Sequence, residues 1–418
     1  MNILRLYFSL LAIIALQMQS ISQVVVNEFS TANYSQWNIG DLQDWIELYN
    51  TGATPSDISG YWLSDDATNP QKWEFPAGST IPAGGYMVVL LSGTGDYDPN
   101  YLGYRNTSFK VTQTNGETLL FSNTSGTVLE SFNIGTLGAL QADHSYARTI
   151  DGAGTWAIHT TPTPEATNAG PSYTDYTSQP TFNIQAGYQS GPIGVTITGE
   201  AGATIYYTID GSEPDNTDNL YTGIINLNST TVLRAIAYSA DPTEYPSLIE
   251  TNTYFFGTDT HSVVVVSIAG ATLSDGNWIG NEQTSIEFFT AAAGTFVVES
   301  HGDSNEHGND SNAYDQRGFD YITRDAMGYD NVLEAPLLSS TDRPNYERLI
   351  FKAAANDNYP YSGGAHIRDA YVHHLSHVGG LHLDERKTET CVLYINGVYW
   401  GVYEIREKVD DIDFTDYY

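Results

Sequence analysis

The stretch VVVNEFSTANYSQWNIGDLQDWIELYN, residues 24–50, decides how the first part of the chain folds. It holds two runs of residues that favour β-structure, 24–29 and 45–50, separated by polar and turn-forming residues. A third run, YMVVLL at 86–91, follows the turn residues IPAGG at 81–85. Short runs of this kind, separated by Gly, Asn and Pro and without helical periodicity, are typical of a β-sandwich or a β-barrel.

Length and composition limit the classes of protein to which the chain can belong. The 418 residues predict about three domains. They include 50 Asp and Glu against 16 Lys and Arg, a net charge of −34, which argues against nucleic acid and anionic membranes as partners. Hydrophobic residues make up 41%, which is enough for packed cores and argues against disorder. The single cysteine, Cys391, excludes a disulfide framework and a cysteine-rich zinc site.

The first 22 residues have the features of a secretory signal peptide. Residues 2–5 supply a positively charged start, residues 6–16 form an apolar run, and Ser20 and Ser22 are small residues at the −3 and −1 positions of a cleavage site. The apolar run is shorter than the ~20 residues that a membrane-spanning helix needs. We therefore expect a protein without a membrane span that is secreted or held at the outer cell surface.

Motifs in the first 171 residues resemble the lamin tail domain, an immunoglobulin-like β-sandwich. They are VVVNEF at 24–29, DWIELYNTG at 44–52, DISGYWLSDD at 57–66 and WEFPAGSTIPAGGYMVV at 73–89. The resemblance implies a sandwich over residues 23–171 that serves as a binding or spacer module. Asp44 and Glu47 could instead form a catalytic carboxylate pair, but we expect such residues on the solvated face of a half-buried strand.

A second set of strand-like runs follows a polar linker at 172–179 and predicts another sandwich over residues 172–258. IYYTIDGSEP, LYTGIINL and VLRAIAY resemble the chitobiase/hexosaminidase C-terminal type of domain, which is fibronectin-III-like. The pair Asp210-Gly211 offers the positive φ that a hairpin turn needs. Tyrosines of this region could stack on sugars, which makes polysaccharide a candidate partner, although tyrosines in strands more often pack against their neighbours.

The third segment, residues 259–418, contains most of the cations. Ten of the 16 basic residues fall in the last 108 positions: Arg317, Arg324, Arg343, Arg348, Lys352, Arg368, Arg386, Lys387, Arg406 and Lys408. They could bind an anion, or they could form ion pairs with the acidic residues that are also dense here.

The order of predicted elements in this segment is that of the small lobe of a protein kinase. We predict paired strands at 284–289 and 294–299, a polar loop at 301–315, strands at 317–322 and 348–352, an amphipathic helix at 365–377, and a hairpin of 391–395 with 399–405. The fold class expected for the whole chain is two all-β immunoglobulin- or fibronectin-like sandwiches followed by an α+β kinase-like small lobe.

Four motifs of the third segment resemble the spore-coat CotH kinase family, in its form from secreted proteins of Bacteroidetes. They are QRGFDYITRDAMGYD at 316–330, RLIFKAAANDNYP at 348–360, AHIRDAYVHHL at 365–375 and VLYINGVYWGVYEIREKVDDIDFTDYY at 392–418. The resemblance implies phosphorylation of Ser or Thr in extracellular or surface proteins, with ATP and a divalent metal such as magnesium. It covers only the N-terminal part of a kinase domain, so we expect the catalytic residues beyond Tyr418 and an inactive fragment here.

This resemblance also suggests which residues meet the nucleotide. Arg317, after the polar loop, is one candidate for the cation on the phosphates, and Lys352 is its rival. Asp369 on the predicted helix could hold either cation, with Arg368 beside it. Glu404 and Arg406 fall where a hinge would meet adenine, although Arg406 and Lys408 with Asp410 could equally form a capped helix start or ion pairs on the surface. The six candidates for nucleotide binding are Arg317, Lys352, Arg368, Asp369, Glu404 and Arg406.

Two metal sites and a second function remain as alternatives. The segment starting at Asp303 begins like a calcium loop, but Tyr314 stands where a bidentate Glu is needed. His373 and His377 have zinc-ligand spacing on a helix, but His374 stands where a metalloprotease has Glu, so we favour no metal. The alternative to a kinase is a non-catalytic surface adhesion or polysaccharide-binding protein.

Overall fold

The computed structural model describes residues 23–418 apart from short gaps. The gaps are residues 41, 96–100, 258–259, 271–272, 274–281, 309–313, 359–362, 382, 384, 410–411 and 418. The predicted signal peptide, residues 1–22, lies outside the described residues. No helix in the described part is long and apolar enough to cross a membrane. The chain divides into two compact units, Met1–Ser172 and Tyr173–Tyr418, and each is described by itself.

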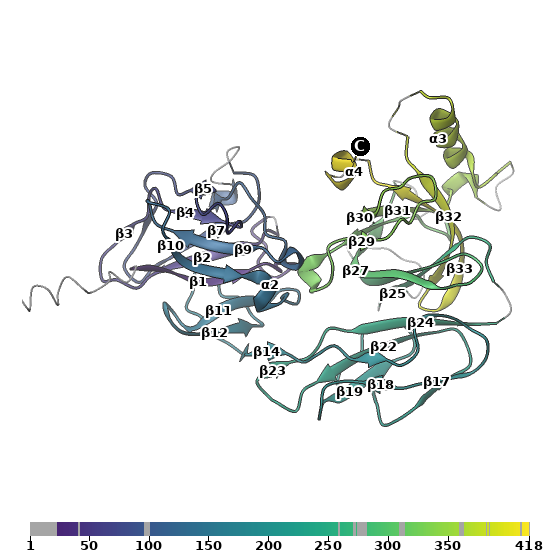
Figure 1. Ribbon diagram of the computed structural model, residues 1–418, viewed down its shortest axis with the longest axis horizontal. Helices are drawn as coiled ribbons and strands as arrows, with labels where there is room; N and C mark the ends of the chain where they lie inside the picture. Colours follow the sequence, from purple (N-terminus) through teal and green to yellow (C-terminus); the bar gives the residue numbers. More distant parts are fainter. Residues whose placement is uncertain are drawn as a thin grey trace, which may run out of the picture. The chain divides into compact units, whose positions relative to one another are not determined.

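The first unit is a β-sandwich, and its described residues form a seven-stranded and a four-stranded sheet (Figure 1). The larger sheet has the order β13(Ser172–Tyr173), β12(Ala153–His159), β11(Ser145–Ile150), β1(Val24–Ser30), β2(Trp45–Asn50), β7(Tyr86–Leu90) and β8(Arg105–Asn106). The smaller has the order β10(Val128–Asn133), β9(Thr118–Ser122), β4(Trp62–Ser64) and β5(Trp73–Glu74), and β3(Ser56–Asp57) pairs with β6(Thr80–Ile81). The three strands predicted around 24–29, 45–50 and 86–91 are confirmed as β1, β2 and β7.

The apolar positions of these strands build the core of the first unit. Trp45, Val88 and Leu90 form a buried cluster on β2 and β7, which pair antiparallel with Trp45 opposite Leu90. A short helix, α2(Ile134–Leu137), follows β10 and has Asn133 as its N-cap, whose side chain accepts a hydrogen bond from the Thr136 amide. Most positions of β1 and β2 are buried on both faces of the sheet, whereas an alternating pattern predicts one buried and one solvated face.

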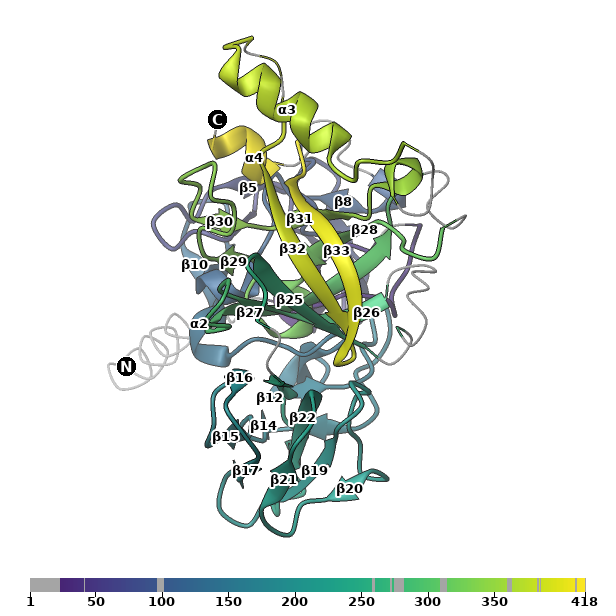
Figure 2. The ribbon, with the colours of Figure 1, turned by 90° about the vertical axis from the view of Figure 1, so that its right-hand side faces the viewer.

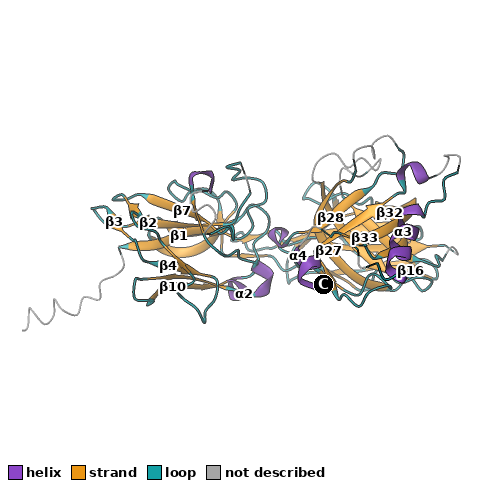
Figure 3. Cartoon of the chain, turned by 90° about the horizontal axis from the view of Figure 1, so that it is seen from above, coloured by secondary structure: helices purple, strands orange, loops and turns teal. Residues whose placement is uncertain are grey.

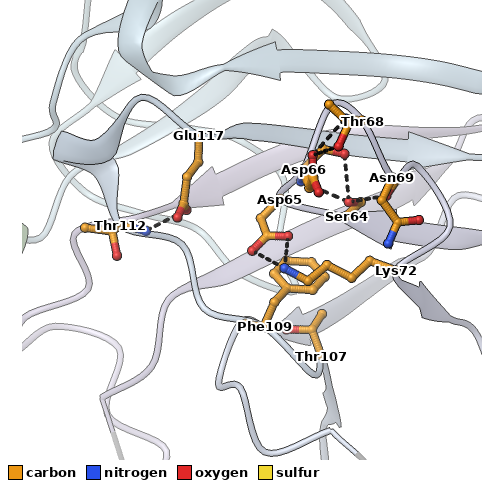
Figure 4. A network of polar contacts seen from close by, with 10 residues as sticks. All are labelled: Ser64, Asp65, Asp66, Thr68, Asn69, Lys72, Thr107, Phe109, Thr112 and Glu117. Atoms are coloured by element: carbon orange, nitrogen blue, oxygen red, sulfur yellow. Dashed lines mark hydrogen bonds and ion pairs between the residues drawn. The ribbon is translucent and has the colours of Figure 1, made fainter. Parts of the chain in front are cut away.

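A polar network fixes the turn between β4 and β5 of the first unit (Figure 4). The Lys72 Nζ lies 2.6 Å from Oδ1 and 2.8 Å from Oδ2 of Asp65, and 5.4 Å from the centroid of the Phe109 ring. The Asp66 carboxylate accepts a hydrogen bond of 2.8 Å from the Thr68 amide. Because these groups satisfy one another, the network accounts for an ordered turn.

The second unit begins with the other predicted sandwich. Its main sheet has the order β16(Gly187–Gln189), β24(Glu250–Phe256), β22(Thr231–Tyr238), β19(Thr204–Thr208) and β20(Asn219–Leu220). Three further pairs are β15(Thr181–Phe182) with β18(Ile197–Thr198), β17(Ile193–Val195) with β21(Ile225–Leu227), and β14(Asp175–Tyr176) with β23(Glu244–Tyr245). The predicted positive φ of Gly211 is present, at 85°.

The rest of the second unit is a closed β-barrel, so the third segment is mainly β, whereas we expected an α+β kinase-like small lobe (Figure 3). Its strand order is β25(Val264–Ala269), β26(Glu282–Phe289), β27(Phe296–Glu306), β28(Phe319–Thr323), β31(Arg348–Lys352), β33(Val398–Glu407) and β32(Thr388–Ile395). Closure comes from β25, a strand that we did not predict. It pairs with β26 on one side and, in parallel, with β32 on the other.

Two helices and several short elements lie outside the strand order of the barrel. They are α3(Arg368–Val378), α4(Ile412–Tyr417) and the strand pair β29(Leu333–Glu334) with β30(Asn345–Tyr346). Single 3-10 turns occur here at Asp325–Met327 and Ala355–Asp357, and in the first unit at Tyr101–Gly103 and Gln113–Asn115. The predicted helix and the hairpin at Asn396-Gly397 are confirmed, and both turn residues have positive φ, 48° and 78°.

Two expectations for the barrel are wrong. The predicted polar loop begins too early, because β27 continues to Glu306 and buries Asp303, whose Oδ2 lies 2.6 Å from Nε of Arg324. A buried, paired aspartate in a strand does not fit a calcium loop. We also expected Arg317 on a strand, but it lies before β28, which begins at Phe319.

The second sandwich and the barrel share a core within this unit. Phe255 of β24 contacts Phe289 of β26, with ring centroids 5.1 Å apart, and Tyr394 of β32, at 4.8 Å. The buried Glu287 accepts a hydrogen bond of 3.0 Å from the Thr253 amide of the sandwich. Apolar packing and buried hydrogen bonds therefore join the two parts.

Candidate functional site

A polar cavity of about 100 Å³ lies where β31, α3 and β33 meet. Pairing of β31 with β33 sets Lys352 opposite Glu404, and Arg406 stands two residues farther along β33. Asp369 in the first turn of α3 lies at the same cavity, where a carboxylate also interacts favourably with the helix dipole. Strand register and helix start thus bring together residues that are 54 positions apart along the chain, from Lys352 to Arg406.

Ion pairs connect these side chains into one network. Lys352 Nζ forms a short ion pair with Oδ2 of Asp369, and Nη1 of Arg406 lies 3.3 Å from the same oxygen. The Nε of Arg406 also donates to Oε1 of Glu404. The hydrogen bond from Lys352, followed by the two positive charges, lowers the pKa of Asp369 below its usual value. Asp369 is therefore ionised at neutral pH and holds two cations at the cavity.

The other wall of the cavity is a loop that the sequence did not single out. The Asp357 carboxylate accepts hydrogen bonds from the amides of Ala365, at 2.8 Å, and Arg368, at 3.0 Å, and its Oδ1 lies 2.9 Å from Nε of Arg368. The hydrogen bond from the Ala365 amide contributes most to lowering the pKa of Asp357. No periodic pattern in the sequence marked Asp357, because the amides that it binds lie eight and eleven residues later in the chain.

Backbone strain is concentrated at this cavity. Ala354, Ala355 and His366 have φ of 61°, 46° and 64°, and all three line it. A left-handed conformation is uncommon for residues other than glycine and is maintained only where the surroundings impose it. His366 is held by Oδ1 of Asn358 at 3.0 Å and by the carbonyl of Val402 at 3.2 Å. Such clustering is typical of functional sites.

Five of the six predicted cofactor-binding residues line this cavity. They are Lys352, Arg368, Asp369, Glu404 and Arg406, and the residues that the sequence missed are Ala354, Ala355, Asp357 and His366. Arg317 is not among the lining residues; its carbonyl accepts a hydrogen bond of 2.9 Å from the Tyr403 hydroxyl. Of the two rival cations, Lys352 is the one that pairs with the helix aspartate.

A smaller polar cavity of about 60 Å³ contains the two histidines with zinc-ligand spacing. Nδ1 of His377 lies 2.7 Å from Nζ of Lys387, and Nδ1 of His373 accepts a hydrogen bond of 3.3 Å from the Arg386 amide. Nowhere in the described part of the chain do three or more His, Cys, Asp or Glu side chains form a group that could hold a metal ion.

The expectation for Glu47 is wrong, because this residue is fully buried on β2. Its Oε1 accepts from the Asn27 side-chain amide at 2.9 Å, and its Oε2 from the Glu165 amide at 2.6 Å. Burial raises the pKa of Glu47 to about 8. Asp44 has a different partner, the Asn33 amide at 3.4 Å, so the contacts give no support to a catalytic pair.

Comparison with known families agrees with the two sandwiches. Residues 17–136 match the model of the Lamin Tail Domain. Residues 184–246 match that of the Chitobiase/beta-hexosaminidase C-terminal domain. No curated protein matches the chain. The chain is thus a modular protein that carries a lamin tail domain followed by a chitobiase C-terminal type of domain, and neither match extends into the barrel that holds the cavity.

Proposed function

We propose that the cavity at Lys352 binds phosphate groups of ATP, as the nucleotide site of a CotH-type kinase that phosphorylates extracellular proteins on Ser or Thr. The ion pair between Lys352 on a strand and Asp369 on the following helix carries this proposal. Kinases use a strand lysine on the phosphates, held by an acidic residue of the next helix. The four sequence motifs of the CotH resemblance include both residues.

The chemistry of the cavity fits phosphate. Lys352, Arg368 and Arg406 supply three cations, and three carboxylates hold them in place, so a phosphate meets preorganised donors. A volume of about 100 Å³ accommodates a phosphate group and not a whole nucleotide, for which sites of about 300 Å³ or more are usual. ATP and magnesium would bring the reactive phosphate and charge neutralisation.

Equilibrium binding of a fluorescent ATP analogue to the whole chain tests the nucleotide site. Lys352→Ala should weaken binding about tenfold or more, since a hydrogen bond to a charged group contributes about 1.5–3 kcal/mol. Lys72→Ala is the matched control, because Lys72 is also paired with an aspartate but lies in the first unit. Equal affinities of the two variants, or no saturable binding by the parent protein, would contradict the proposal.

Polysaccharide binding is the second candidate function, and the match to the chitobiase C-terminal domain supports it. Half-exposed tyrosines lie on β19 and β22, where Tyr206 and Tyr238 form an edge-to-face pair with centroids 5.6 Å apart. Aromatic rings of this kind present an apolar face and a polar tip to a sugar. A glycan array probed with the whole protein and with Tyr206→Ala tests this; a blank array argues against it.

A further inference from the structure

Two Asn-Gly pairs occur in the chain, and the structure holds them in opposite ways. They are Asn115-Gly116 in the first unit and Asn396-Gly397 in the second. Because glycine has no Cβ, the amide that follows each asparagine is open to approach and its backbone turns easily. In such a pair the backbone nitrogen of the glycine can attack the asparagine side chain, and the surrounding structure decides how fast this happens.

Asn115 ends the 3-10 turn before β9, and its side chain is unrestrained. Its backbone amide donates to the carbonyl of Thr112 at 3.2 Å, whereas its exposed side chain makes no hydrogen bond to a described residue. Gly116 has a left-handed φ of 69°, and its amide has no hydrogen-bond partner in the described part of the chain. A Cβ at Gly116 would have no described atom within 4 Å. Both groups that must react are therefore accessible.

Asn396 begins the two-residue turn between β32 and β33, the hairpin drawn in yellow in Figure 2. The backbone of Gly270 holds its side chain, because Oδ1 accepts from the Gly270 amide and Nδ2 donates to the Gly270 carbonyl, both at 3.0 Å. Its own amide donates to the carbonyl of Ile268 at 2.9 Å. The side chain must break both hydrogen bonds to Gly270 before its carbonyl carbon can reach the Gly397 amide, so the same reaction is hindered here.

The reaction is an intramolecular substitution followed by hydrolysis. The Gly116 nitrogen forms a bond to the side-chain carbonyl carbon of Asn115, the bond from that carbon to Nδ2 breaks, and Nδ2 leaves as ammonia with the amide proton. Water then opens the five-membered succinimide at one of its two carbonyls. Opening at one carbonyl gives aspartate. Opening at the other gives isoaspartate, in which the backbone runs through the former side chain and is one methylene longer.

The position of the turn gives isoaspartate a structural consequence. Oε2 of Glu117 accepts from the Thr112 amide at 2.9 Å, and the Glu117 carbonyl accepts at 2.8 Å from the amide of Ile134, the first residue of α2. Gly116 also lies against this helix, since a Cβ at Gly135 would be 3.0 Å from the Gly116 Cα. An extra methylene just before Gly116 displaces both contacts of the turn with α2.

We propose that Asn115 is a site of spontaneous deamidation in the folded protein, that Asn396 is protected from it, and that isoaspartate at position 115 loosens the start of α2. Both products carry a new negative charge, but only isoaspartate lengthens the backbone. Aspartate therefore leaves the turn in place, whereas isoaspartate weakens the hydrogen bond between Glu117 and Ile134. The proposal does not depend on nucleotide or polysaccharide binding.

Mass spectrometry of tryptic peptides from the whole protein, kept in mildly alkaline buffer, measures both reactions. Cleavage after Lys110 and Arg148 releases residues 111–148, and cleavage after Lys387 and Arg406 releases residues 388–406, in which Asn396 is the one asparagine. Fragment ions should place a gain of one dalton at Asn115 at least tenfold faster than at Asn396. In concentrated urea the two rates should agree within threefold, because unfolding removes the hydrogen bonds to Gly270.

Asn115→Gln is the control for this measurement, because the longer side chain closes a six-membered ring far more slowly and should remove the gain at position 115. Equal rates at Asn115 and Asn396 in the folded protein would overturn the proposal. A tenfold difference that persists in urea would also overturn it, since the difference would then come from the neighbouring sequence and not from the fold.

Hydrogen exchange at the Ile134 amide tests the structural consequence. Protein enriched in isoaspartate by long incubation should exchange this amide at least tenfold faster than fresh protein, whereas Asn115→Asp should exchange it at the rate of fresh protein. Equal exchange in incubated and fresh protein, or the same acceleration in Asn115→Asp, would show that the longer backbone does not loosen α2.

Discussion

Buried carboxylates in the lamin tail domain show how strongly surroundings control a single side chain. Glu28 and Glu47 are both fully buried and interact with the charge of Asp151. Burial raises the pKa of Glu28 as well as that of Glu47. The donors that satisfy them include the amides of Thr163 and Glu165, more than a hundred residues away in sequence. The alternation of apolar and polar residues within a strand does not show that residues so distant in sequence cover this face of the sheet. We therefore wrongly expected Glu47 on the solvated face.

Glu47 should make the first unit less stable in alkaline solution. Its pKa is about 8 in the folded chain against a reference of 4.5, so its stabilising contribution is complete below pH 4.5 and is lost as the pH rises through 8. Each pKa unit corresponds to about 1.4 kcal/mol. Glu47→Gln, which stays neutral, should reduce the loss of stability between pH 6 and pH 9.

Hydrogen exchange of the β1 and β2 amides in the whole protein measures this pH dependence. Asp57→Asn is the control, because Asp57 is exposed and its pKa is lowered by hydrogen bonds from Ser59. The same alkaline loss in Glu47→Gln as in the parent protein would show that Glu47 is not responsible.

Side chains of the candidate site were largely predictable because sequence motifs mark them, whereas their arrangement was not. Lys352, Asp369 and Arg406 stand in three separate motifs and meet only through strand register and the start of α3. Asp357 and His366 escaped prediction because they belong to a loop whose shape depends on left-handed backbone conformations. Arg317 was placed on a strand by its apolar neighbours, but β28 begins two residues later.

Whole strands and the hairpin were easier to predict than the way they close. The runs at 284–289 and 348–352 have clear β-patterns, and both are strands. β25 was missed although VVVVSIA is strongly apolar, because its role as the closing strand depends on pairing with β32 more than a hundred residues later. The orientation of α3 was also missed, since its apolar residues Val372 and Leu375 are exposed and periodicity defines an apolar stripe but not what covers it.

Contact between β27 and β28 leaves no room for a side chain at Gly302. A Cβ at this position would lie 2.0 Å from the carbonyl oxygen of Ile322, a backbone atom that cannot turn aside. Gly302→Ala should therefore force the two strands apart and destabilise the barrel by about 3 kcal/mol or more. Gly191→Ala is the control, because a Cβ there has nothing within 4 Å.

Thermal unfolding followed by circular dichroism compares the two glycine variants. Gly302→Ala should unfold at a clearly lower temperature and Gly191→Ala near that of the parent protein. Indistinguishable unfolding of the two variants would mean that β27 and β28 adjust to the added carbon without cost.

The second sandwich and the barrel should unfold together, because they share a core. Phe255→Ala removes a ring that contacts both parts and should cost about 3–5 kcal/mol. Exchange protection should fall by a similar factor in β22 of the sandwich and in β25 to β28 of the barrel. Ile224→Ala, at an exposed position, should change neither. Loss of protection confined to sandwich strands would show that the two parts unfold separately.

Acidic groups where the second sandwich meets the barrel should make the second unit less stable as the pH rises, as Glu47 does for the first unit. Burial raises the pKa of Glu287 and of Glu250 to about 7 and that of Glu299 to about 8, and the positive charge of Arg234 on β22 partly opposes the shift of Glu287. Their stabilising contribution is complete below pH 4.5 and is lost as the pH rises through 7 to 8. The buried His301 acts oppositely, since its lowered pKa disfavours folding below its usual titration range.

Closure of the barrel by β25 and β32 has a consequence for biosynthesis. β25 leaves the ribosome more than a hundred residues before its partner β32, so the growing chain carries an unpaired strand edge throughout that interval. Phe255 also lacks its contact with Tyr394 until the last hairpin has emerged. A nascent chain that stalls before Thr388 should therefore be prone to aggregation, and chaperones that shield open strand edges should matter most for this protein while the residues between β25 and β32 are being made.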